Sequence, residues 1–363
     1  MSASARTSRL STRLRQAPTR YEPTALLAMG GMAEVWRATA TFEDGTEHPV
    51  AIKRVRPTMG DAIYHAMFED EARIGMMLRH PNIVRVFDAR EVRDVYFLVM
   101  ELVDGEPLRG LLRVAHERGA KMPLQAALFI TRELVAALEY AHGATDANGR
   151  PLSLVHRDVS PHNLLLSRAG EVKLVDFGLA DTTVNTAVRG DLVGGKLAYL
   201  APELALQKAH DHRVDLFAAG VLLWEMLAGR RLFHGADAGE TVRAVMRCEV
   251  PWLREVNSSV PESVDMLVQQ LVTRSPSSRV ESATVLRERV EKIIADIGNA
   301  AGPRDVGLLV NLHLARHDAR RDVKTLERHV VEHLAEELAA LANGAAAKVD
   351  QTGARRRGRL AAR

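Results

Sequence analysis

Short apolar runs fill the first hundred positions of the chain. Five of them are rich in β-branched or aromatic residues and are bounded by Gly, Pro or Asp, which is typical of strands. They are TALLAM (24–29), EVWRATA (34–40), HPVAIKRV (48–55), IVRVFDA (83–89) and VYFLVMEL (95–102). A helical pattern at residues 61–80 separates the third run from the fourth. Residues 21–102 are therefore predicted to form a small β-rich lobe with one main helix.

Helical periods dominate the middle of the chain. An apolar face recurs at helical spacing over residues 124–141, and VDLFAAGVLLWEMLAG (214–229) is apolar almost all round. A helix without a polar face lies at the centre of its domain. Residues 103–296 are therefore predicted to form a larger α-helical lobe, joined to the first by a hinge at residues 101–105. The fold class predicted for the whole chain is α+β and two-lobed.

Two further helical stretches follow, at about 304–318 and 322–342. The second carries an apolar stripe of Leu326, Val330, Leu334, Leu338 and Leu341. We expect a helical C-terminal extension, residues 297–347, that packs on the protein body, on a partner, or on a second copy through these leucines. Residues 329–333 read HVVEH, as in one class of zinc peptidase, but the remaining chain is too short for such a domain. A surface helix is the favoured interpretation.

The composition is that of an ordinary globular protein, with 47% apolar and 26% charged residues. No run approaches the roughly 18 apolar residues of a membrane helix, so no membrane span is expected. The single cysteine, Cys248, cannot form an internal disulfide, which favours a reducing, cytoplasmic location. The net charge of +3 comes from two basic tails, 1–20 and 348–363, because the body between them carries about −7. We expect disordered tails and no binding of nucleic acid.

A carboxylate interrupts the apolar face of the predicted 61–80 helix. That face is made by Ile63, Met67, Ile74 and Leu78. Glu71 falls on it, and a carboxylate there is costly unless a cation meets it. Lys53, at the end of an apolar strand-like run, is the nearest candidate. Such a pair is either purely structural or fixes an ammonium where phosphate oxygens bind.

Three more polar residues adjoin apolar segments. In LVHRDVSPHNLLLS (154–167), Asp158 and Asn163 lie between two apolar flanks, and Asp176 ends an apolar run just before Phe177-Gly178. A carboxylate at a strand end suits a hard cation, and Asn163 can supply a second, neutral oxygen. Asp158 then remains as the carboxylate that accepts a proton from a hydroxyl.

Together these residues resemble the protein kinase superfamily, in particular the eukaryotic-like serine/threonine kinases of bacteria. The matching residues are Val50-Ala51-Ile52-Lys53, Glu71, His156-Arg157-Asp158 with Asn163, Asp176-Phe177-Gly178, Ala201-Pro202-Glu203, Asp215, Gly220 and Arg279. The likeness covers about residues 24–296. Each motif alone is weak evidence, whereas their common order and spacing are specific.

The resemblance implies a role for each matching residue. Lys53, held by Glu71, would contact the α- and β-phosphates of ATP, and Asp158 would orient the attacking hydroxyl and accept its proton. Asn163 and Asp176 would bind Mg2+, with Mn2+ as an alternative. Further nucleotide-binding positions are implied at Leu27, Ala28, Met29, Gly30, Gly31, Met32, Ala33, Glu34, Val35, Ala51, Met100, Glu101 and Val103.

The glycine-rich loop departs from the family pattern. Where three glycines are expected, residues 28–35 read AMGGMAEV, and only the middle one, Gly30, remains. Alanine keeps the small size but resists positive φ. We expect weaker nucleotide binding, with a covering loop of backbone amides still feasible.

Two further departures concern a single charge. Ser160 stands where the family carries a lysine that steadies the γ-phosphate, and Lys196 replaces a threonine that normally contacts that lysine. We hypothesise that the charge has changed sides: Lys196, a candidate catalytic residue, reaches Asp158 and the γ-phosphate, and Ser160 accepts it. The alternative is that the long, flexible lysine only points into solvent.

Arg157 resembles the residue that receives a phosphorylated activation segment in this family. The candidate phosphate acceptors are Thr182, Thr183 and Thr186. A phosphate there could pair with Arg157 and order the segment, so autophosphorylation is expected.

The resemblance implies an ATP- and magnesium-dependent kinase that phosphorylates Ser or Thr hydroxyls of protein substrates. A pseudokinase acting as a nucleotide-binding signalling scaffold is the main alternative, favoured by Ala28, Ala33 and Ser160. A small-molecule kinase of related fold is a second alternative, against which the Ala-Pro-Glu motif at 201–203 argues.

Overall fold

The computed structural model describes residues 18–29, 33–55, 62–92, 95–146, 148–177, 196–318, 338 and 347–348, and for 62–67, 317–318 and 347–348 it describes the backbone alone. These residues fall into two compact units. The first contains the described residues up to Arg79, Val84–Leu102, and the last three described positions. The second contains His80–Ile83 and the chain from Val103 to residue 318.

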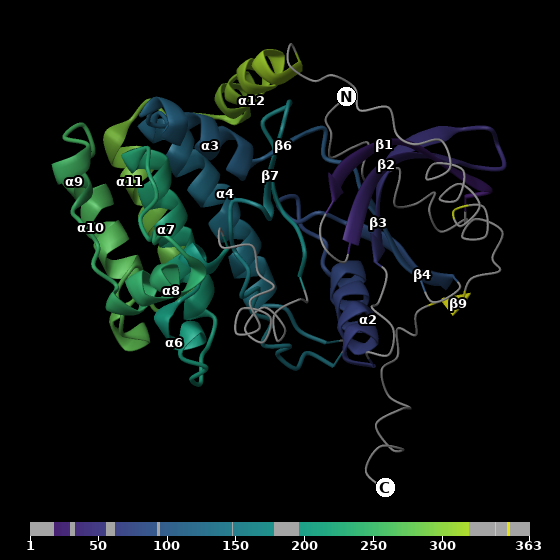
Figure 1. Ribbon diagram of the computed structural model, residues 1–363, viewed down its shortest axis with the longest axis horizontal. Helices are drawn as coiled ribbons and strands as arrows, with labels where there is room; N and C mark the ends of the chain where they lie inside the picture. Colours follow the sequence, from purple (N-terminus) through teal and green to yellow (C-terminus); the bar gives the residue numbers. More distant parts are fainter. Residues whose placement is uncertain are drawn as a thin grey trace, which may run out of the picture. The chain divides into compact units, whose positions relative to one another are not determined.

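The first unit is built on an antiparallel sheet (Figure 1). In spatial order its strands are β1 (Arg20–Met29), β2 (Ala33–Thr41), β3 (Glu47–Val55), β5 (Val95–Glu101), β4 (Val86–Val92) and β9 (Ala347–Lys348). The main helix is α2 (Ala62–Met77), which packs on the sheet where the rings of Phe68 and Tyr96 lie 4.7 Å apart. The five predicted strands and the predicted helix are confirmed. β4 begins three residues later than predicted because Ile83 instead pairs with Leu174 of the second unit.

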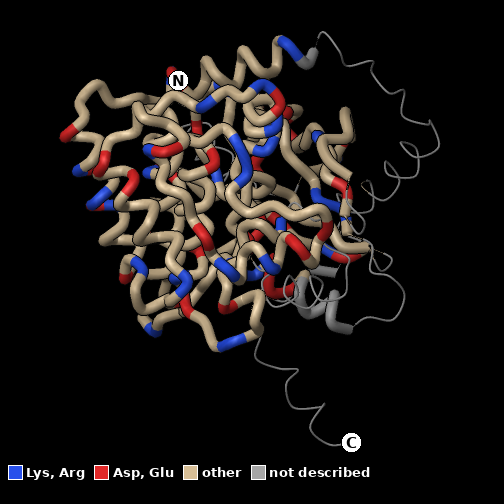
Figure 2. Tube along the Cα trace, turned by 60° about the vertical axis from the view of Figure 1, so that its left-hand side comes forward, with Lys and Arg blue, Asp and Glu red and all other residues tan. Residues whose placement is uncertain are grey.

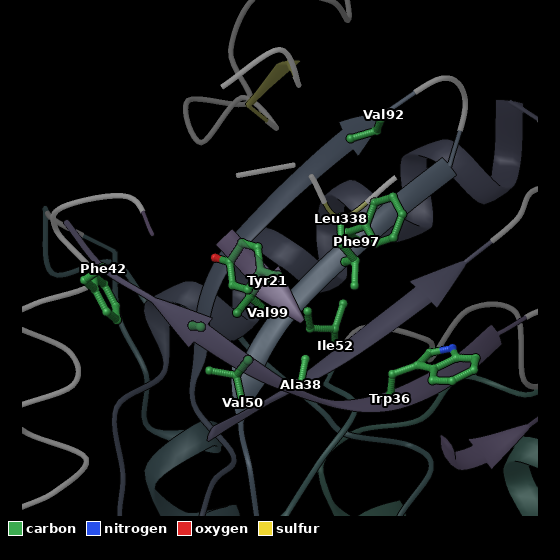
Figure 3. Packing of buried hydrophobic residues seen from close by; sticks show 11 residues of the cluster. Tyr21, Trp36, Ala38, Phe42, Val50, Ile52, Val92, Phe97, Val99 and Leu338 are labelled. Carbon is green, nitrogen blue, oxygen red and sulfur yellow. The ribbon is translucent and has the colours of Figure 1, made fainter. Parts of the chain in front are cut away.

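The two faces of this sheet differ in what covers them. Strand residues alternate between faces, and the register places Val35 opposite Lys53 and Lys53 opposite Leu98 on one face. The other face carries the buried cluster of Tyr21, Trp36, Ala38, Ala40, Phe42, Val50, Ile52, Val92, Phe97, Val99 and Leu338 (Figure 3). Leu338 is fully buried there, although it is distant in sequence from every strand beneath it. A C-terminal leucine therefore completes the core of the first unit.

The second unit is mainly helical. Its helices are α3 (Leu108–Arg118), α4 (Leu124–His142), α6 (Pro202–Ala205), α7 (Arg213–Ala228), α8 (Ala238–Arg247), α9 (Leu253–Val256), α10 (Glu262–Leu271), α11 (Ala283–Ile297) and α12 (Pro303–Asp318), with short 3-10 helices η1 (Leu197–Tyr199) and η2 (Pro276–Ser278). A small antiparallel sheet of β6 (Gly105–Pro107), β7 (Leu164–Ser167) and β8 (Val172–Leu174) completes it. Every residue of α7 after Arg213 is buried, which confirms the predicted central helix. The predicted α+β class is likewise confirmed.

Helix α12 packs closely on the turn between β7 and β8. A Cβ on Gly170 would lie 1.6 Å from the Pro303 carbonyl oxygen, and one on Gly307 would lie 2.7 Å from that of Arg168. Asn311 also exchanges two 3.1 Å hydrogen bonds with Arg168. The predicted 304–318 helix is confirmed and belongs to the second unit, whereas Leu338 belongs to the first. The rest of the predicted 322–342 helix, including HVVEH, lies outside the described residues.

Charges are mixed along the described chain, and Figure 2 shows acidic and basic residues interspersed. The predicted basic tails lie outside the described residues, apart from 18–20 and 348. Among the described segments, each helix is too short or too polar to cross a lipid bilayer.

Candidate active site

A buried ion pair joins strand β3 to helix α2 in the first unit. Lys53 Nζ donates to Glu71 Oε1 over 2.6 Å, and the two side chains are only 7% and 6% exposed. Ala51 and Ile52, which precede Lys53 on β3, are apolar and buried, which fixes the direction of the lysine stem. The predicted pairing is therefore present. It holds an ammonium at a fixed place on the sheet, as the phosphate-binding role requires.

The residues expected to cover the nucleotide lie at the ends of β1 and β2. Leu27, Ala28 and Met29 end β1, and Leu27 and Met29 are 48% and 69% exposed. Ala33 and Val35 begin β2. Gly30, Gly31 and Met32 lie outside the described residues.

Glu34 was predicted to bind nucleotide, but its side chain takes part in a different contact. Glu34 pairs in register with Arg54, one step from the pairing of Val35 with Lys53, so it lies on the opposite face from Lys53. Its Oε2 accepts from Trp36 Nε1 at 3.0 Å and from Arg54 at 3.2 Å. Only the backbone of Glu34 could then serve the nucleotide. Alternation along β2 could have revealed this from the sequence.

Three of the implied nucleotide-binding positions, Ala51, Met100 and Glu101, lie on the neighbouring strands β3 and β5. Ala51 and Met100 are paired across β3 and β5 on the Lys53 face, and both are buried. The Glu101 backbone N–H donates to the Arg85 carbonyl at 2.8 Å, so this N–H is already engaged within the sheet. Val103, the last of the set, belongs to the second unit.

Asp158 stands at the centre of the polar cluster in the second unit. Its Oδ2 accepts from Asn163 Nδ2 at 2.8 Å and from Lys196 Nζ at 2.6 Å. The same Asn163 amide donates to the Asp158 carbonyl at 2.9 Å, which orients its Oδ1 away from the aspartate. Asp158 and Asn163 are 6% and 4% exposed. Lys196 therefore reaches Asp158 as hypothesised, and it does so rather than pointing into solvent.

The expected contact of Lys196 with Ser160 is wrong. Ser160 Oγ is buried and has no hydrogen-bond partner among the described residues. The lysine instead donates to the Asp158 carboxylate, which is the stronger acceptor because it is charged. His162 lies nearby, where burial lowers its pKa to about 4, aided by Arg109 and Lys196. At neutral pH that imidazole is uncharged, so it adds no positive charge to that of Lys196.

The backbone before Asp158 is anchored to the central helix. Asp215 of α7, fully buried, accepts from the backbone N–H groups of His156 at 2.8 Å and Arg157 at 2.7 Å. His142 Nε2 lies 2.8 Å from the same carboxylate. Burial would raise the pKa of Asp215, but the hydrogen bonds with His142 and His156 hold it below its ordinary value. These bonds secure Arg157 at a φ of 59°, a strained angle for a non-glycine residue.

The end of β8 is tied to the same loop. The Val175 backbone N–H donates to the Asn163 carbonyl at 2.9 Å, and His156 Nε2 lies 3.0 Å from the Val175 carbonyl. The His156 ring meets the Phe177 ring edge-on at 4.5 Å. Asp176, between Val175 and Phe177, takes the left-handed φ of 66°. These contacts place Asp176 and Asn163 on segments that are joined to each other.

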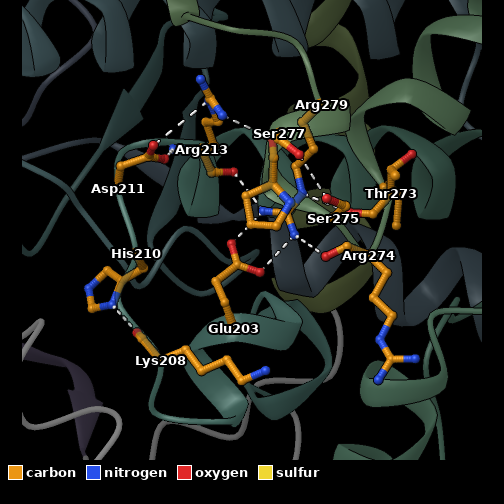
Figure 4. A network of polar contacts seen from close by, with 12 residues as sticks. Glu203, Lys208, His210, Asp211, Arg213, Thr273, Arg274, Ser275, Ser277 and Arg279 are labelled. Atoms are coloured by element: carbon orange, nitrogen blue, oxygen red, sulfur yellow. Dashed lines mark hydrogen bonds and ion pairs between the residues drawn. The ribbon is translucent and has the colours of Figure 1, made fainter.

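A second buried ion pair secures the Ala201-Pro202-Glu203 motif. Arg279 donates from both terminal nitrogens to Glu203, at 2.6 and 2.7 Å (Figure 4). Its guanidinium lies over the Phe217 ring at 4.8 Å. This bidentate geometry is the strong form of an arginine–carboxylate contact. Arg279 is thus the partner of the Ala-Pro-Glu acid, as the sequence predicted. The threonines at 182, 183 and 186 lie outside the described residues.

The protein kinase domain family matches residues 21–290 of the chain. The chain belongs to that family. It is 34% identical over 306 residues to the tyrosine-protein kinase MasK of Myxococcus xanthus, covering 83% of this chain and 47% of that protein. It is 33% identical over 266 residues to the serine/threonine-protein kinase PrkC of Bacillus subtilis, covering 73% and 39%. With PknL of Mycobacterium tuberculosis the identity is 34%, covering 77% and 66%.

The kinase domain spans two thirds or less of the length of each of these relatives. Their names give two classes of acceptor, tyrosine and serine/threonine. Membership of the family implies ATP and a divalent metal ion.

Sequence reasoning missed two residues that shape the site of this kinase domain. One is His142, whose imidazole contributes to anchoring Asp215. The other is Glu225 of α7, which accepts from the Tyr199 hydroxyl at 2.6 Å and from the Leu232 N–H at 3.1 Å. Burial raises the pKa of Glu225 to about 7. A charged residue inside an all-apolar helix was the available signal, and it was the same signal that drew attention to Glu71.

Proposed function

We propose that this chain is an ATP-dependent protein kinase that transfers the γ-phosphate to serine or threonine hydroxyls of protein substrates. The observation that carries the proposal is the buried Asp158 carboxylate, with Asn163 and Lys196 both donating to one of its oxygens. A carboxylate held in this way presents its other oxygen at a fixed position. It suits the acceptance of a proton from an alcohol during phosphoryl transfer.

The two lysines would meet different phosphate groups of ATP. Lys53, fixed by Glu71, would bind the α- and β-phosphates. As the acceptor oxygen bonds to the γ-phosphorus, its proton passes to Asp158 and the bond to the β-phosphate oxygen breaks, releasing ADP. Lys196 would neutralise charge on the γ-phosphoryl group, in place of the lysine that the family carries at position 160.

Two residues fit a magnesium ion. Asn163 offers an amide oxygen whose orientation is fixed by its bonded nitrogen, and Asp176 offers a carboxylate. Mg2+ commonly binds to one or two protein oxygens and completes its shell with water and phosphate. Across the described residues, three or more His, Cys, Asp or Glu side chains nowhere gather to hold a metal ion, so an all-protein cage is not proposed. Bound magnesium would neutralise the charge of the transferring phosphoryl group. Mn2+ is proposed as an alternative ion at the same two residues.

The acceptor is proposed to be serine or threonine because most of the named relatives carry that description. The name of MasK makes tyrosine the alternative acceptor. Phosphoamino-acid analysis of the labelled product distinguishes them. Phosphotyrosine alone would overturn the acceptor assignment while leaving the kinase assignment intact.

A pseudokinase would lack at least one of the catalytic groups. Lys53, Glu71, Asp158, Asn163 and Asp176 are all present, so this alternative is not favoured. The test is incubation with γ-labelled ATP, Mg2+ and a generic basic protein such as myelin basic protein, with Asp158→Asn as the matched control. Label in the protein that depends on Asp158 supports the proposal. Equal label with both proteins, or binding of ATP without any transfer, contradicts it.

Autophosphorylation is part of the proposal. Mass spectrometry of the 178–195 segment, after expression of the native and the Asp158→Asn chains, is expected to find phosphate on Thr182, Thr183 or Thr186 only in the native chain. Unmodified segments in both chains would remove this part of the proposal.

A further inference from the structure

A groove runs along the surface of the second unit between α3, the loop from α3 to α4, and α12. It encloses about 500 Å³. Its apolar lining includes Leu111, Val114, Met122, Leu309 and Leu312. Arg118, Lys121 and Arg316 add three cations, and Glu117 is the acidic residue among the lining. We refer to this feature as the basic groove.

Both walls of the basic groove are held by contacts outside it. On the loop side, the Met122 N–H donates to the Met226 carbonyl at 2.9 Å, and Lys121 Nζ donates to the Val256 carbonyl at 2.8 Å. On the other side, α12 is fixed to the β7–β8 turn by Asn311 and by the close approach at Gly307. The groove is therefore formed before any ligand arrives, which lowers the cost of binding.

The charges of the basic groove are not balanced from within the described chain. Arg118 and Arg316 are exposed, and neither has an acidic partner among the residues that the structure describes. Lys121 is bonded to a neutral carbonyl. Glu117 is therefore the sole carboxylate set against three cations in the lining. The complementary ligand is anionic.

An apolar stripe on α12 extends beyond the groove. Leu308 and Leu312 are 60% and 48% exposed, and Arg316 follows at the same spacing of four residues. These three residues share one face of the helix and span about 12 Å, at about 1.5 Å per residue. A compact ligand held within the groove would leave Leu308 in water. A second helix lying along α12 would cover it as well.

We propose that the basic groove and the adjoining face of α12 bind an acidic amphipathic helix of a partner protein. The apolar side chains of that helix would enter between Leu111 and Leu309 and pack on Leu312, with its carboxylates meeting Arg118 and Arg316. Helices recognised in this way present apolar residues at i, i+3 or i+4, and i+7. The inference is independent of the proposed catalytic function.

The probe for this site is a fluorescein-labelled peptide of about 18 residues, with leucines at helical spacing and glutamates elsewhere. Its twin carries lysine at every glutamate position. Fluorescence anisotropy with the full chain is expected to give a micromolar Kd for the acidic peptide and at least about tenfold weaker binding for the basic twin. Equal binding of both peptides, or of neither, would overturn the proposal.

Charge reversal places the interaction in the groove. The double variant Arg118→Glu/Arg316→Glu is expected to weaken the acidic peptide at least about tenfold and to strengthen the basic twin. The matched control is Arg113→Glu, which reverses an exposed arginine of α3 outside the groove lining and should change the Kd less than about twofold. Loss of affinity in the control as large as in the double variant would contradict the assignment.

Two other occupants are distinguished in the same series. The first is a small amphiphile, tested with dodecanoate. If dodecanoate binds the native chain, loses affinity in the charge-reversal variant, and the acidic peptide does not bind, the groove is an amphiphile site and the helix proposal is overturned. A dimer in sedimentation velocity that Leu312→Glu dissociates would identify a second copy as the occupant and overturn it as well. Binding of the peptide to the Asp158→Asn chain at native affinity is expected, since the groove has no part in phosphoryl transfer.

Discussion

The two lysine–carboxylate pairs of this kinase domain have equal nitrogen–oxygen distances but are held by different kinds of secondary structure. Lys53 lies 2.6 Å from Glu71 in the first unit, and Lys196 lies 2.6 Å from Asp158 in the second. The first pair stands on a strand and a helix, and its lysine is 7% exposed. The second joins a loop to the residue just before a three-residue 3-10 helix, and its lysine is 23% exposed.

The difference shows that the positive charge beside Asp158 can come from an element other than the loop that carries position 160. Lys53 is fixed by a packed strand, so its position follows from regular secondary structure. Lys196 reaches the Asp158 carboxylate from another element, and we propose that it takes up the role that the family assigns to position 160. A loop residue can be exchanged in this way because reaching the carboxylate matters more than the element from which it is reached.

The largest effect is expected from neutralising the acid of each pair. Asp158→Asn should lower kcat about 10²- to 10⁴-fold because the proton acceptor is lost, with little change in stability. Glu71→Gln should lower the unfolding free energy by about 3 kcal/mol, since it leaves a buried ammonium without its counter-charge. It should lower kcat less than Asp158→Asn does. Initial rates with labelled ATP and urea unfolding measure both. A larger loss of kcat in Glu71→Gln than in Asp158→Asn would reverse the comparison.

The next effect concerns the core that supports the first pair. Leu338→Ala should lower the unfolding free energy by about 2–5 kcal/mol, because removal of a fully buried leucine leaves a cavity in the core of the first unit. Leu308→Ala is the matched control, since that leucine is 60% exposed and its loss should cost less than about 0.5 kcal/mol. Chemical denaturation of both variants provides the measurement. Similar midpoints for the two would show that Leu338 does not contribute to the core.

A smaller effect is expected at the second pair. Lys196→Ala should lower kcat about 10- to 100-fold through lost charge stabilisation. The exchange variant Ser160→Lys/Lys196→Thr should recover at least about fivefold over Lys196→Ala, since it restores the family arrangement of that charge. Steady-state rates at saturating ATP test both variants. Near-native activity of Lys196→Ala would end the idea that the lysine replaces the missing one.

The smallest effect is a dependence of stability on pH at Glu225. Its pKa rises from an ordinary 4.5 to about 7 in the folded protein, so the folded state binds the proton more tightly than the unfolded chain. The stabilisation is complete below about pH 4.5 and is lost as the pH rises through 7. Between pH 5 and 7 the loss should be on the order of 1–2 kcal/mol. Glu225→Gln should flatten this part of the unfolding profile, and an unchanged slope would contradict the assignment.

The sequence predicted those features that depend on local pattern. Runs of β-branched and aromatic residues, bounded by Gly, Pro or Asp, predicted the strands of the first unit. A carboxylate within an apolar stripe led to the pair of Lys53 and Glu71. Features that depend on tertiary packing were not accessible. Leu338 was recognised as apolar, but the surface that it covers was not, and the basic groove exists only because α12 meets the β7–β8 turn. The predicted contact of Ser160 with Lys196 failed because the lysine donates to the charged Asp158 carboxylate, which is the stronger acceptor.

The family match ends at residue 290, whereas Leu338 is fully buried in the core of the first unit. The family match and the packed core of the first unit therefore end at different residues. A chain shortened to residue 290 would keep every catalytic side chain named above. It would lose Leu338, which packs on the apolar face of the sheet. Such a fragment should aggregate on expression, and inactivity measured with it would reflect misfolding and not chemistry.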